Sequence, residues 1–258
     1  MTWRLGVVGS PIAHSLSPRL HEAGLALARL EGTSERVELG QHDVAALREM
    51  MGRRFDALSV TMPLKPVAAR LCDSLDEVAS RIGVVNSLLV RDGRLLGACT
   101  DGAGLLDALR DQFGFSCEGQ RAVVLGSGGA AGEIVDALVA CGVGSVSVLG
   151  RTPTRVHEIT GRYTNVRDQL DDGRIDLVVN TIPAPSRDGA QRLPGTSEAT
   201  IAIDIAYDPP LTPWRSLYGE AGCRTANGLG MLAYQAALQM QWWWGVPIEG
   251  AALLEVIT

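Results

Sequence analysis

The sequence predicts an α/β protein built from two domains. Apolar runs of strand length alternate with helical patterns along almost the whole chain, which is typical of βαβ units around a parallel sheet. The 258 residues are many for one hydrophobic core, because single cores stop growing near about 250 residues. A polar, glycine-containing joint at 114–120 precedes a fresh strand, turn and helix, so we expect the second domain to begin close to it.

The first half of the chain alternates strand and helix patterns. Strands are predicted at 5–9, 36–40, 57–61, 86–90 and 95–99, and helices at 18–30, 44–52 and 66–72. Ser17 and Pro18 mark the start of the first helix, with Ser17 as its N-cap and proline at the first helical position. Pro66 marks the start of the third helix in the same way.

The second half repeats the alternation. Strands are predicted at 122–126, 145–149, 177–180 and 201–205, and helices at 104–113, 129–141 and 230–244, with another after Pro247. The segment 101–113 is expected to connect the two domains. The three successive tryptophans at 242–244 sweep about 200 degrees of a helix, so they cannot all face one core. Packing between helices explains them, and the alternative is a subunit contact in a homodimer.

The composition excludes several classes of protein. The chain is 46% hydrophobic and 20% charged, which is typical of a soluble globular protein. A net charge of -6 without a lysine- or arginine-rich run argues against nucleic-acid and membrane binding. No leader is expected at the N-terminus, and the longest weakly polar stretch, 137–150, is too short to span a bilayer. We therefore expect a cytoplasmic protein.

The cysteines and histidines suggest no metal centre. The five cysteines are scattered and never form a CxxC pair, so neither a disulfide framework nor a zinc site is expected, which fits a reducing compartment. His14, His21, His42 and His157 show no ligand spacing. We expect these four side chains to have structural or surface positions.

Residues 121–131 form a strand that leads into a glycine-rich turn and a helix, the GxGxx(G/A) pattern in its required context. Gly126 permits the tight turn, Gly128 lets the backbone approach a pyrophosphate, and Ala131 allows close packing of helix on strand. The free amides at the helix start would hold phosphates. The alternative is a glycine-rich turn without a ligand.

The segment after the next predicted strand indicates which dinucleotide is bound. A fold of this type that uses NAD places a carboxylate roughly 20 residues on, to bind the ribose 2'-hydroxyl. Here the segment 147–155 carries no carboxylate and two guanidinium groups, Arg151 and Arg155. This favours a 2'-phosphate and therefore NADP, whereas the alternative is a solvated helix start.

Lys65 is the one lysine among 23 basic residues. The bias toward arginine reflects genome composition in the simplest explanation, but only an ammonium can give up its proton in the accessible pH range. Lys65 also follows a predicted strand and opens a helix, where the helix dipole disfavours an ammonium by ~0.3 to 1 kcal/mol. We therefore expect a chemical role, the alternative being an exposed surface lysine.

A hairpin predicts the partner of this lysine. The turn at 91–94 joins two alternating strands and sets Leu89 opposite Leu96, and Asn86 opposite Cys99. Asn86 and Asp101 therefore emerge at the same end of the hairpin. A carboxylate there that reaches Lys65 would hold its ammonium in place, whereas the alternative for Asp101 is a helix cap.

Two hydroxyls in the first half form a candidate anion site. Ser15 and Ser17 lie at i and i+2 of an extended segment and point the same way, beside a helix start. This arrangement predicts a cradle for a carboxylate, and capping by Ser17 alone is the alternative.

In order along the chain, these segments resemble the shikimate dehydrogenase family. The matching motifs are GSPIAHSLSPRLH at 9–21, SVTMPLK at 59–65, GVVNS at 83–87, TDGAG at 100–104, GSGGAA at 126–131, GRTPTR at 150–155, DIAYDPPLT at 204–212 and GLGMLAYQ at 228–235. The resemblance implies an α/β substrate domain from residues 1–101 completed by C-terminal helices at 231–258. It implies a Rossmann-type NADP-binding domain from residues 102–230.

The family resemblance also implies an activity and a set of site residues. The activity is NADP-dependent reversible reduction of 3-dehydroshikimate to shikimate, in aromatic amino-acid biosynthesis, with no metal. Catalysis is assigned to Lys65 and Asp101. Substrate binding is assigned to Ser15, Ser17, Thr61, Asn86, Asp101, Tyr207 and Gln235. Cofactor binding is assigned to Gly126, Ser127, Gly128, Gly129, Ala130, Arg151, Thr152, Arg155, Ile205, Gly228, Met231 and Glu77.

Four residues depart from the usual family pattern, which has asparagine at each place: Glu22, Ser59, Cys99 and Gly150. None of these changes removes a proposed catalytic atom. Ser59 and Cys99 lie beside substrate residues in the sequence, so the identity of the ring acid stays open. A dehydrogenase of quinate or aminoshikimate is the first alternative, and a regulator that senses NADP(H) without turnover is the second.

Overall fold

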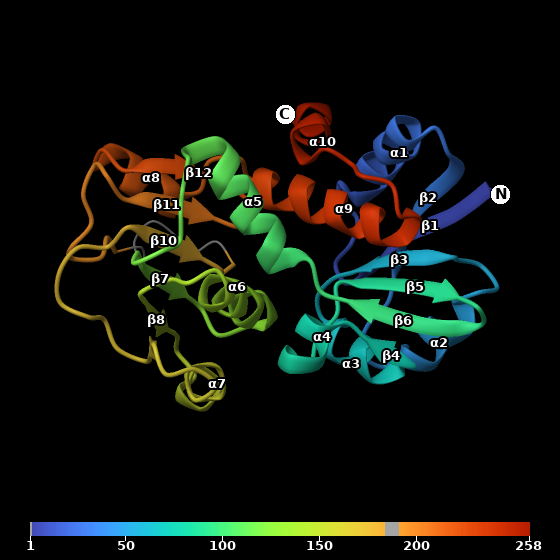
Figure 1. Cartoon of the computed structure of the whole chain (residues 1–258), viewed down its shortest axis with the longest axis horizontal. Helices are drawn as coiled ribbons and strands as arrows, with labels where there is room; N and C mark the ends of the chain where they lie inside the picture. The colour runs from blue at the N-terminus through green and yellow to red at the C-terminus, as the bar shows by residue number, and fades with distance from the viewer. Residues whose placement is uncertain (1, 184–190) are drawn as a thin grey trace. The chain divides into compact units, whose positions relative to one another are not determined.

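The computed structural model describes residues 2–183 and 191–258, and the chain has the predicted α/β fold (Figure 1). It divides into two compact units, Met1–Gly104 with Leu232–Thr258, and Leu105–Met231. Each unit contains one six-stranded sheet. The divisions fall inside helix α5 (Asp101–Phe113) and helix α9 (Leu229–Trp244), so these two helices carry the chain between the units.

The sheet of the first unit has the strand order β2-β1-β3-β5-β6-β4. Its strands are β1 (Thr2–Gly9), β2 (Glu31–Glu38), β3 (Ala57–Val60), β4 (Ser74–Leu75), β5 (Ser87–Arg91) and β6 (Arg94–Ala98). The hairpin register is confirmed, because Leu89 lies opposite Leu96. The sheet is mixed, since β5 runs antiparallel to both β3 and β6, as the predicted hairpin requires. A tight turn can join only antiparallel strands.

The helices of the first unit are mostly short. They are α1 (Ser17–Ala28), α2 (Val44–Met50), α3 (Lys65–Leu71), α4 (Glu77–Ile82) and α10 (Gly250–Ile257), together with the start of α5 and most of α9. The prediction missed α4, although Asp76 caps it by accepting a hydrogen bond from the amide of Ala79 at 2.7 Å. It also placed the second strand too late, because β2 is a polar edge strand that starts at Glu31 without an apolar pattern.

The predicted N-cap of the first helix is wrong. Leu16 occupies the N-cap position without a side-chain cap, and Ser17 is the first helical residue. The amide of Ser17 instead donates to Ser15 Oγ at 3.3 Å, and the two hydroxyls lie 3.2 Å apart. Ser17 therefore lies inside the helix, one residue beyond the N-cap position that the Ser-Pro signal indicated for it.

The sheet of the second unit is wholly parallel, with the order β12-β11-β10-β7-β8-β9. Its strands are β7 (Arg121–Leu125), β8 (Ser145–Leu149), β9 (Val166–Arg167), β10 (Leu177–Asn180), β11 (Ile201–Asp204) and β12 (Arg224–Ala226). Its complete helices are α6 (Gly129–Ala140), α7 (Pro153–Thr160) and α8 (Pro213–Glu220). This is the order of a doubly wound dinucleotide-binding sheet, whose switch point lies between β7 and β10.

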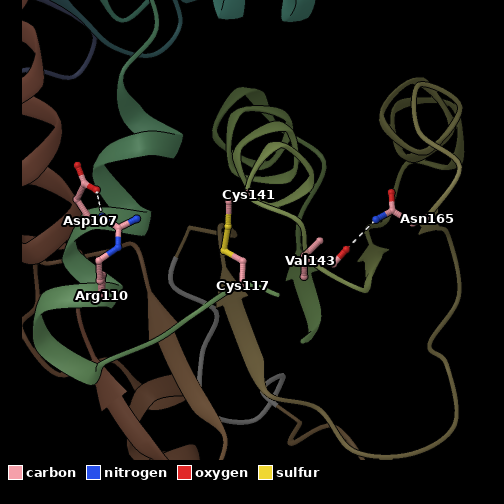
Figure 2. Close-up of a disulfide and its surroundings, with 6 residues drawn as sticks. All are labelled: Asp107, Arg110, Cys117, Cys141, Val143 and Asn165. Carbon is pink, nitrogen blue, oxygen red and sulfur yellow. Dashed lines mark hydrogen bonds and ion pairs between the residues drawn. A yellow bond between two sulfur atoms is a disulfide. The ribbon is translucent and has the colours of Figure 1, made fainter. Parts of the chain in front are cut away.

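A disulfide joins Cys117 to Cys141 in the second unit (Figure 2). Cys117 lies in the loop before β7 and Cys141 follows the end of α6, with 5.9 Å between their Cα atoms, within the usual range for a disulfide. This corrects the expectation of no disulfide and removes the cysteine argument for a reducing compartment. The pairing depends on α6 folding back over β7, which no spacing rule within the sequence encodes.

Helix α9 is the longest of the described helices, with 16 residues. Its tryptophans do face different surroundings: Trp243 is buried, whereas Trp242 and Trp244 are half-buried. Trp244 packs near Trp3, with 6.1 Å between the ring centroids.

Across residues 2–183 and 191–258, every helix falls short of the length and apolar character needed to cross a membrane.

Candidate active site

One edge of the first sheet gathers most of the predicted substrate and catalytic residues. The carboxyl ends of β1, β3 and β6 and the amino end of β5 share this edge, because β5 alone runs the opposite way among these four. Loops at the carboxyl ends of parallel strands are where α/β proteins place their ligands. The first unit therefore builds its candidate site from four strand ends.

Lys65 and Asp101 form an ion pair at this edge, between Lys65 Nζ and Asp101 Oδ2. Lys65 opens α3 after β3, and Asp101 opens α5 after β6, so each side chain starts a helix. Only 13% of each side chain is exposed. The dipole of α5 favours the carboxylate, whereas that of α3 disfavours the ammonium, so the carboxylate compensates the lysine for its position.

Asn86 holds the other oxygen of the same carboxylate. Its Nδ2 donates to Asp101 Oδ1 at 2.6 Å, and its Oδ1 accepts from the amide of Thr100 at 2.9 Å. The same Nδ2 lies within bonding distance of Thr100 Oγ1 and of Gln235 Oε1, at 3.0 and 3.1 Å. The two Asn86 amide hydrogens thus face three acceptors, which fixes the Asn86 side chain and orients Asp101.

Gln235 reaches this cluster from α9, far away in the sequence. The main-chain oxygen of Gln235 accepts from Thr100 Oγ1 at 3.1 Å, and its Nε2 donates to Leu232 O at 2.8 Å. A Cβ added at Gly104 would lie 2.4 Å from the amide nitrogen of Gln235, so glycine permits α5 to approach α9 here. The structure thus brings Lys65, Asn86, Asp101 and Gln235 together.

Ser15, Ser17 and Thr61 lie at the same edge, in the segments that follow β1 and β3. Ser17 is buried, whereas Ser15 and Thr61 are half-buried. A Cβ added at Gly9 would contact Thr61 Cγ2, which shows how closely the two segments approach. These positions fit the predicted substrate residues, whose roles stay predictions.

Two predicted ligand residues, Glu77 and Tyr207, make none of the hydrogen bonds described above for this cluster. Glu77, assigned to the cofactor, lies in the first unit, where its carboxylate pairs with Arg81 at 3.6 Å and its side chain is 94% exposed. Tyr207, assigned to substrate, belongs to the second unit and is half-buried. Their roles stay predictions.

The glycine-rich turn of the second unit has the conformation that the sequence predicts. Gly126 has a φ of +112°, in the region that favours glycine, and its missing Cβ would meet Thr181 Oγ1. Gly128 is the N-cap of α6, with no side-chain cap and nothing within 4 Å of an added Cβ. Gly128 and Gly129 are exposed, so the start of α6 is open to a ligand at this point, as a phosphate site requires.

The second predicted cofactor element is the start of α7. Thr152 is its N-cap, with Arg151 before it and Arg155 within its first turn, and all three are exposed. Within the described residues, neither guanidinium makes a hydrogen bond or ion pair. Ser127 Oγ lies 3.0 Å from the Cβ that Gly150 lacks, so the ends of β7 and β8 lie close together.

The remaining predicted cofactor residues surround the end of β11. A Cβ on Gly228 would coincide with the carbonyl of Ile205, so only glycine fits there. The Gly228 amide donates to Ala206 O at 3.2 Å, and Met231 is buried at the start of α9. Among the described residues, no group of three or more His, Cys, Asp or Glu side chains could hold a metal ion.

A buried histidine, His21, contacts residues to which the sequence analysis assigned no role. His21 is 0% exposed, its Nδ1 lies 2.8 Å from Ser34 Oγ, and its Nε2 lies 2.9 Å from Ser59 Oγ. Ser59 Oγ donates to Gln239 Oε1 at 2.7 Å, and Gln239 Nε2 donates to Asn86 O at 2.9 Å. No spacing pattern links these residues, because they come from separate elements.

The direction of these hydrogen bonds fixes the tautomer of His21. The Ser59 hydrogen goes to Gln239, so Ser59 Oγ must accept from His21 Nε2. Nδ1 then accepts from the Ser34 hydroxyl. Burial lowers the pKa of His21 to about 3, so the ring is neutral at physiological pH.

Known proteins are similar to this chain over nearly its whole length. The family model described as the shikimate dehydrogenase substrate binding domain matches residues 7–88. The shikimate dehydrogenase (NADP(+)) of Exiguobacterium sp. is 36% identical over 248 residues, which cover 94% of this chain and 93% of that protein. The chain belongs to the shikimate dehydrogenase family.

Solved structures of the family share the fold. Shikimate 5-dehydrogenase from Thermus thermophilus, solved with NADP(H) and shikimate, is 34% identical, with a TM-score of 0.89 over 98% of both chains. The Mycobacterium tuberculosis enzyme is 31% identical, with a TM-score of 0.85 over 98% of this chain and 97% of its own. A 5-ketofructose reductase from Gluconobacter sp. is 24% identical with a TM-score of 0.85, a likeness in fold alone.

We predict that His21 makes stability depend on pH. Because its folded pKa of about 3 lies below the unfolded value of 6.5, the unfolded state binds the proton first as the pH falls. The free energy of unfolding should therefore be fully retained above pH 6.5 and fall below it, by at most about 1.4 kcal/mol per pH unit. Urea unfolding between about pH 7.5 and 5 measures this slope.

The matched variants for this measurement are His21→Asn and His14→Asn. The first should lose the slope whatever its absolute stability, and the second should keep it, because His14 is exposed. Apart from these two histidines, the wild-type protein and the two variants have the same titratable groups. An unchanged slope in His21→Asn would contradict the prediction.

Proposed function

We propose that this chain catalyses the reversible, NADP-dependent reduction of 3-dehydroshikimate to shikimate, as an oxidoreductase of aromatic amino-acid biosynthesis. The observation that carries the proposal is the ion pair of Lys65 and Asp101, enclosed at the edge where the first sheet gathers its polar residues. Membership of the shikimate dehydrogenase family supports it, as do relatives named shikimate dehydrogenase (NADP(+)).

The proton chemistry follows from the pair. During reduction the C=O π bond breaks, the ring carbon gains a hydride, and the Lys65 ammonium gives a proton to the oxygen as general acid. During oxidation the neutral amine takes that proton back. Asp101 orients Lys65 through Oδ2 and would also bind a ring hydroxyl, while Asn86 keeps the carboxylate turned toward Lys65.

The remaining substrate contacts come from the same edge and one residue of the second unit. Ser15 and Ser17 are proposed to hold the carboxylate of the ring acid, because their hydroxyls lie together beside the start of α1. Thr61, Asn86, Gln235 and Tyr207 are proposed to bind the ring. Hydroxyl and amide groups suit a polyhydroxylated ring because each can donate and accept.

The second unit fits NADP. The glycine-rich turn leaves open space at the start of α6, where backbone amides can hold a pyrophosphate through residues 126–130. Arg151, Thr152 and Arg155 would hold the 2'-phosphate, and Ile205, Gly228, Met231 and Glu77 are the further proposed contacts. When bound, the nicotinamide supplies the hydride chemistry.

The alternatives of the same family differ in the ring acid. Ser59 is occupied by His21 and Gln239, so its replacement of asparagine does not by itself provide a new contact for quinate or aminoshikimate. Cys99 is buried, and its amide donates to Asp76 Oδ2 at 3.2 Å. A regulator that only senses NADP(H) would have no use for the buried Lys65–Asp101 pair.

Location and assembly complete the proposal. We place the protein in the cytoplasm, where a biosynthetic enzyme meets its nicotinamide supply, without binding to nucleic acid or membrane. We also propose a homodimer, which would bury exposed apolar side chains such as Leu27, 53% of which is exposed.

Initial rates test the proposed function. Purified protein should oxidise shikimate with NADP, and its kcat/KM for shikimate should exceed that for quinate and aminoshikimate. A higher kcat/KM for quinate would replace the substrate but keep the enzyme class. Tight NADP binding without turnover of any of these acids would instead identify a sensor.

We predict that Arg151→Ala removes most of the preference for NADP over NAD. A charge-assisted hydrogen bond contributes roughly 1.5 to 3 kcal/mol, which corresponds to about ten- to a hundredfold in cofactor preference. The kinetics with NAD should stay nearly unchanged, since NAD lacks the 2'-phosphate. Equal losses with both cofactors, measured by KM, would assign Arg151 a structural role.

We predict that Lys65→Ala lowers kcat by about 10² to 10⁴, the range for a positioned acid-base group, with a smaller change in KM. Lys65→Arg should also fail, because guanidinium keeps its proton and cannot act as the base. Asp101→Asn should weaken both substrate binding and kcat. Full activity in Lys65→Ala would remove the lysine from the mechanism, and near-normal kcat in Lys65→Arg would reduce its role to placing a positive charge.

A further inference from the structure

The buried face of α9 carries three polar side chains, each one helical turn from the next: Gln235, Gln239 and Trp243. Residues four apart lie on the same side of a helix. At most 6% of each residue is exposed, and each hydrogen-bonds either Ser87, the first residue of β5, or Asn86 directly before it. Gln235 Oε1 accepts from Asn86 Nδ2 at 3.1 Å, Gln239 Nε2 donates to Asn86 O at 2.9 Å, and Trp243 Nε1 donates to Ser87 Oγ at 2.8 Å.

Gln239 holds the main chain of Asn86, while Gln235 contacts its side chain. Asn86 O also accepts the ladder hydrogen bond from the amide of Val60 at 2.7 Å, so both of its lone pairs are used. The peptide that carries Asn86 is therefore fixed between the neighbouring strand and α9. With its main-chain oxygen held by Gln239 and its side-chain amide held by Gln235, Asn86 has little freedom to turn.

Gln239 is itself fixed by a chain of hydrogen bonds that starts on β2. Ser34 donates to His21, His21 to Ser59, Ser59 to Gln239, and Gln239 to Asn86. Gln239 can join this series because its side-chain amide both accepts from Ser59 and donates to Asn86. An apolar side chain of the same size would fill this space without the cost of burying an amide, so packing alone does not account for a glutamine.

The series ends at the catalytic pair. Asn86 Nδ2 donates to Asp101 Oδ1 at 2.6 Å, and Asp101 Oδ2 pairs with Lys65 Nζ. We propose that Gln239 is a positioning residue, which through Asn86 fixes the orientation of the Asp101 carboxylate and so the place of the Lys65 ammonium. The expected effect on kcat rests on the proposed function. The expected effect on the position of the Lys65 side chain does not.

The test uses two variants that each remove buried hydrogen bonds made by the same face of α9. Gln239→Met keeps the length of the side chain and loses both of its bonds, to Ser59 and to Asn86. Ser87→Ala removes the acceptor of Trp243 Nε1, one turn along α9, and leaves every contact of Gln239 intact. Ser87→Ala is thus the matched control for a purely structural loss.

In steady-state kinetics with shikimate and NADP, Gln239→Met should lower kcat by about ten- to a hundredfold, the effect of small misplacements of reacting groups. Its KM for NADP should stay within about twofold, because the cofactor residues are untouched. Ser87→Ala should keep the wild-type kcat even where its Tm falls as far. Equal loss of kcat in both variants would overturn the proposal.

Lys65 permits a second readout that needs no turnover. It is the one lysine in the sequence, so protein labelled with ¹³C at lysine Cε gives a single side-chain resonance. Gln239→Met should shift or broaden this resonance, because the carboxylate beside Lys65 loses its fixed orientation, whereas Ser87→Ala should leave it at the wild-type position. An unmoved resonance in folded Gln239→Met would contradict the proposal directly.

Ser59→Ala serves where Gln239→Met does not fold. It removes the hydroxyl between His21 and Gln239 but keeps the bond to Asn86, so we expect a smaller shift of the same Lys65 resonance. No shift with Ser59→Ala in that case would overturn the proposal. A wild-type protein that does not oxidise shikimate would defeat the proposed function, while the resonance would still decide whether Gln239 positions Lys65.

Discussion

Two opposite charges, Lys65 at the start of α3 and Asp101 at the start of α5, meet in the first unit where little water reaches them. Breaking a buried ion pair costs about 3 to 5 kcal/mol because it leaves a charge uncompensated. The pair forms only if β3 and β6 end at the same edge, which requires the β3–β5–β6 register. A slip of one residue would turn Asn86 and its neighbours to the opposite face of the sheet.

This part of the site could be predicted from local rules. The turn at 91–94 fixes the hairpin register, and the register alone places Asn86 near Asp101. Lys65 stands out by being the one lysine and by its place between a strand and a helix. The glycine-rich turn is equally local, since the strand, glycines and helix of residues 121–131 are continuous in the sequence. Gln235 was reached only through the family resemblance, because α9 meets Asn86 across 149 residues.

The sequence rules failed where the deciding contact is distant or where a side chain competes with a local signal. The Cys117–Cys141 disulfide depends on how α6 packs, and the contacts of the His21 cluster come from β2, β3 and α9. Ser17 carries an N-cap signal but uses its amide and hydroxyl on Ser15, so it lies inside the helix instead of capping it. Strand β2 lies at the edge of its sheet and consists almost wholly of polar residues. Its sequence therefore shows no alternation of apolar and polar residues from which a strand could be predicted.

That polar edge strand also bears on how the protein behaves at high concentration. An open strand edge is a template for pairing with another chain, and charged side chains or brevity suppress it. On β2, the exposed Glu31, Glu35, Arg36 and Glu38 surround the free edge with charge. The three other sheet edges described here, β4, β9 and β12, are only two or three residues long. Neither sheet therefore offers an incoming strand a long, uncharged ladder, which protects the folded chain from edge-to-edge aggregation.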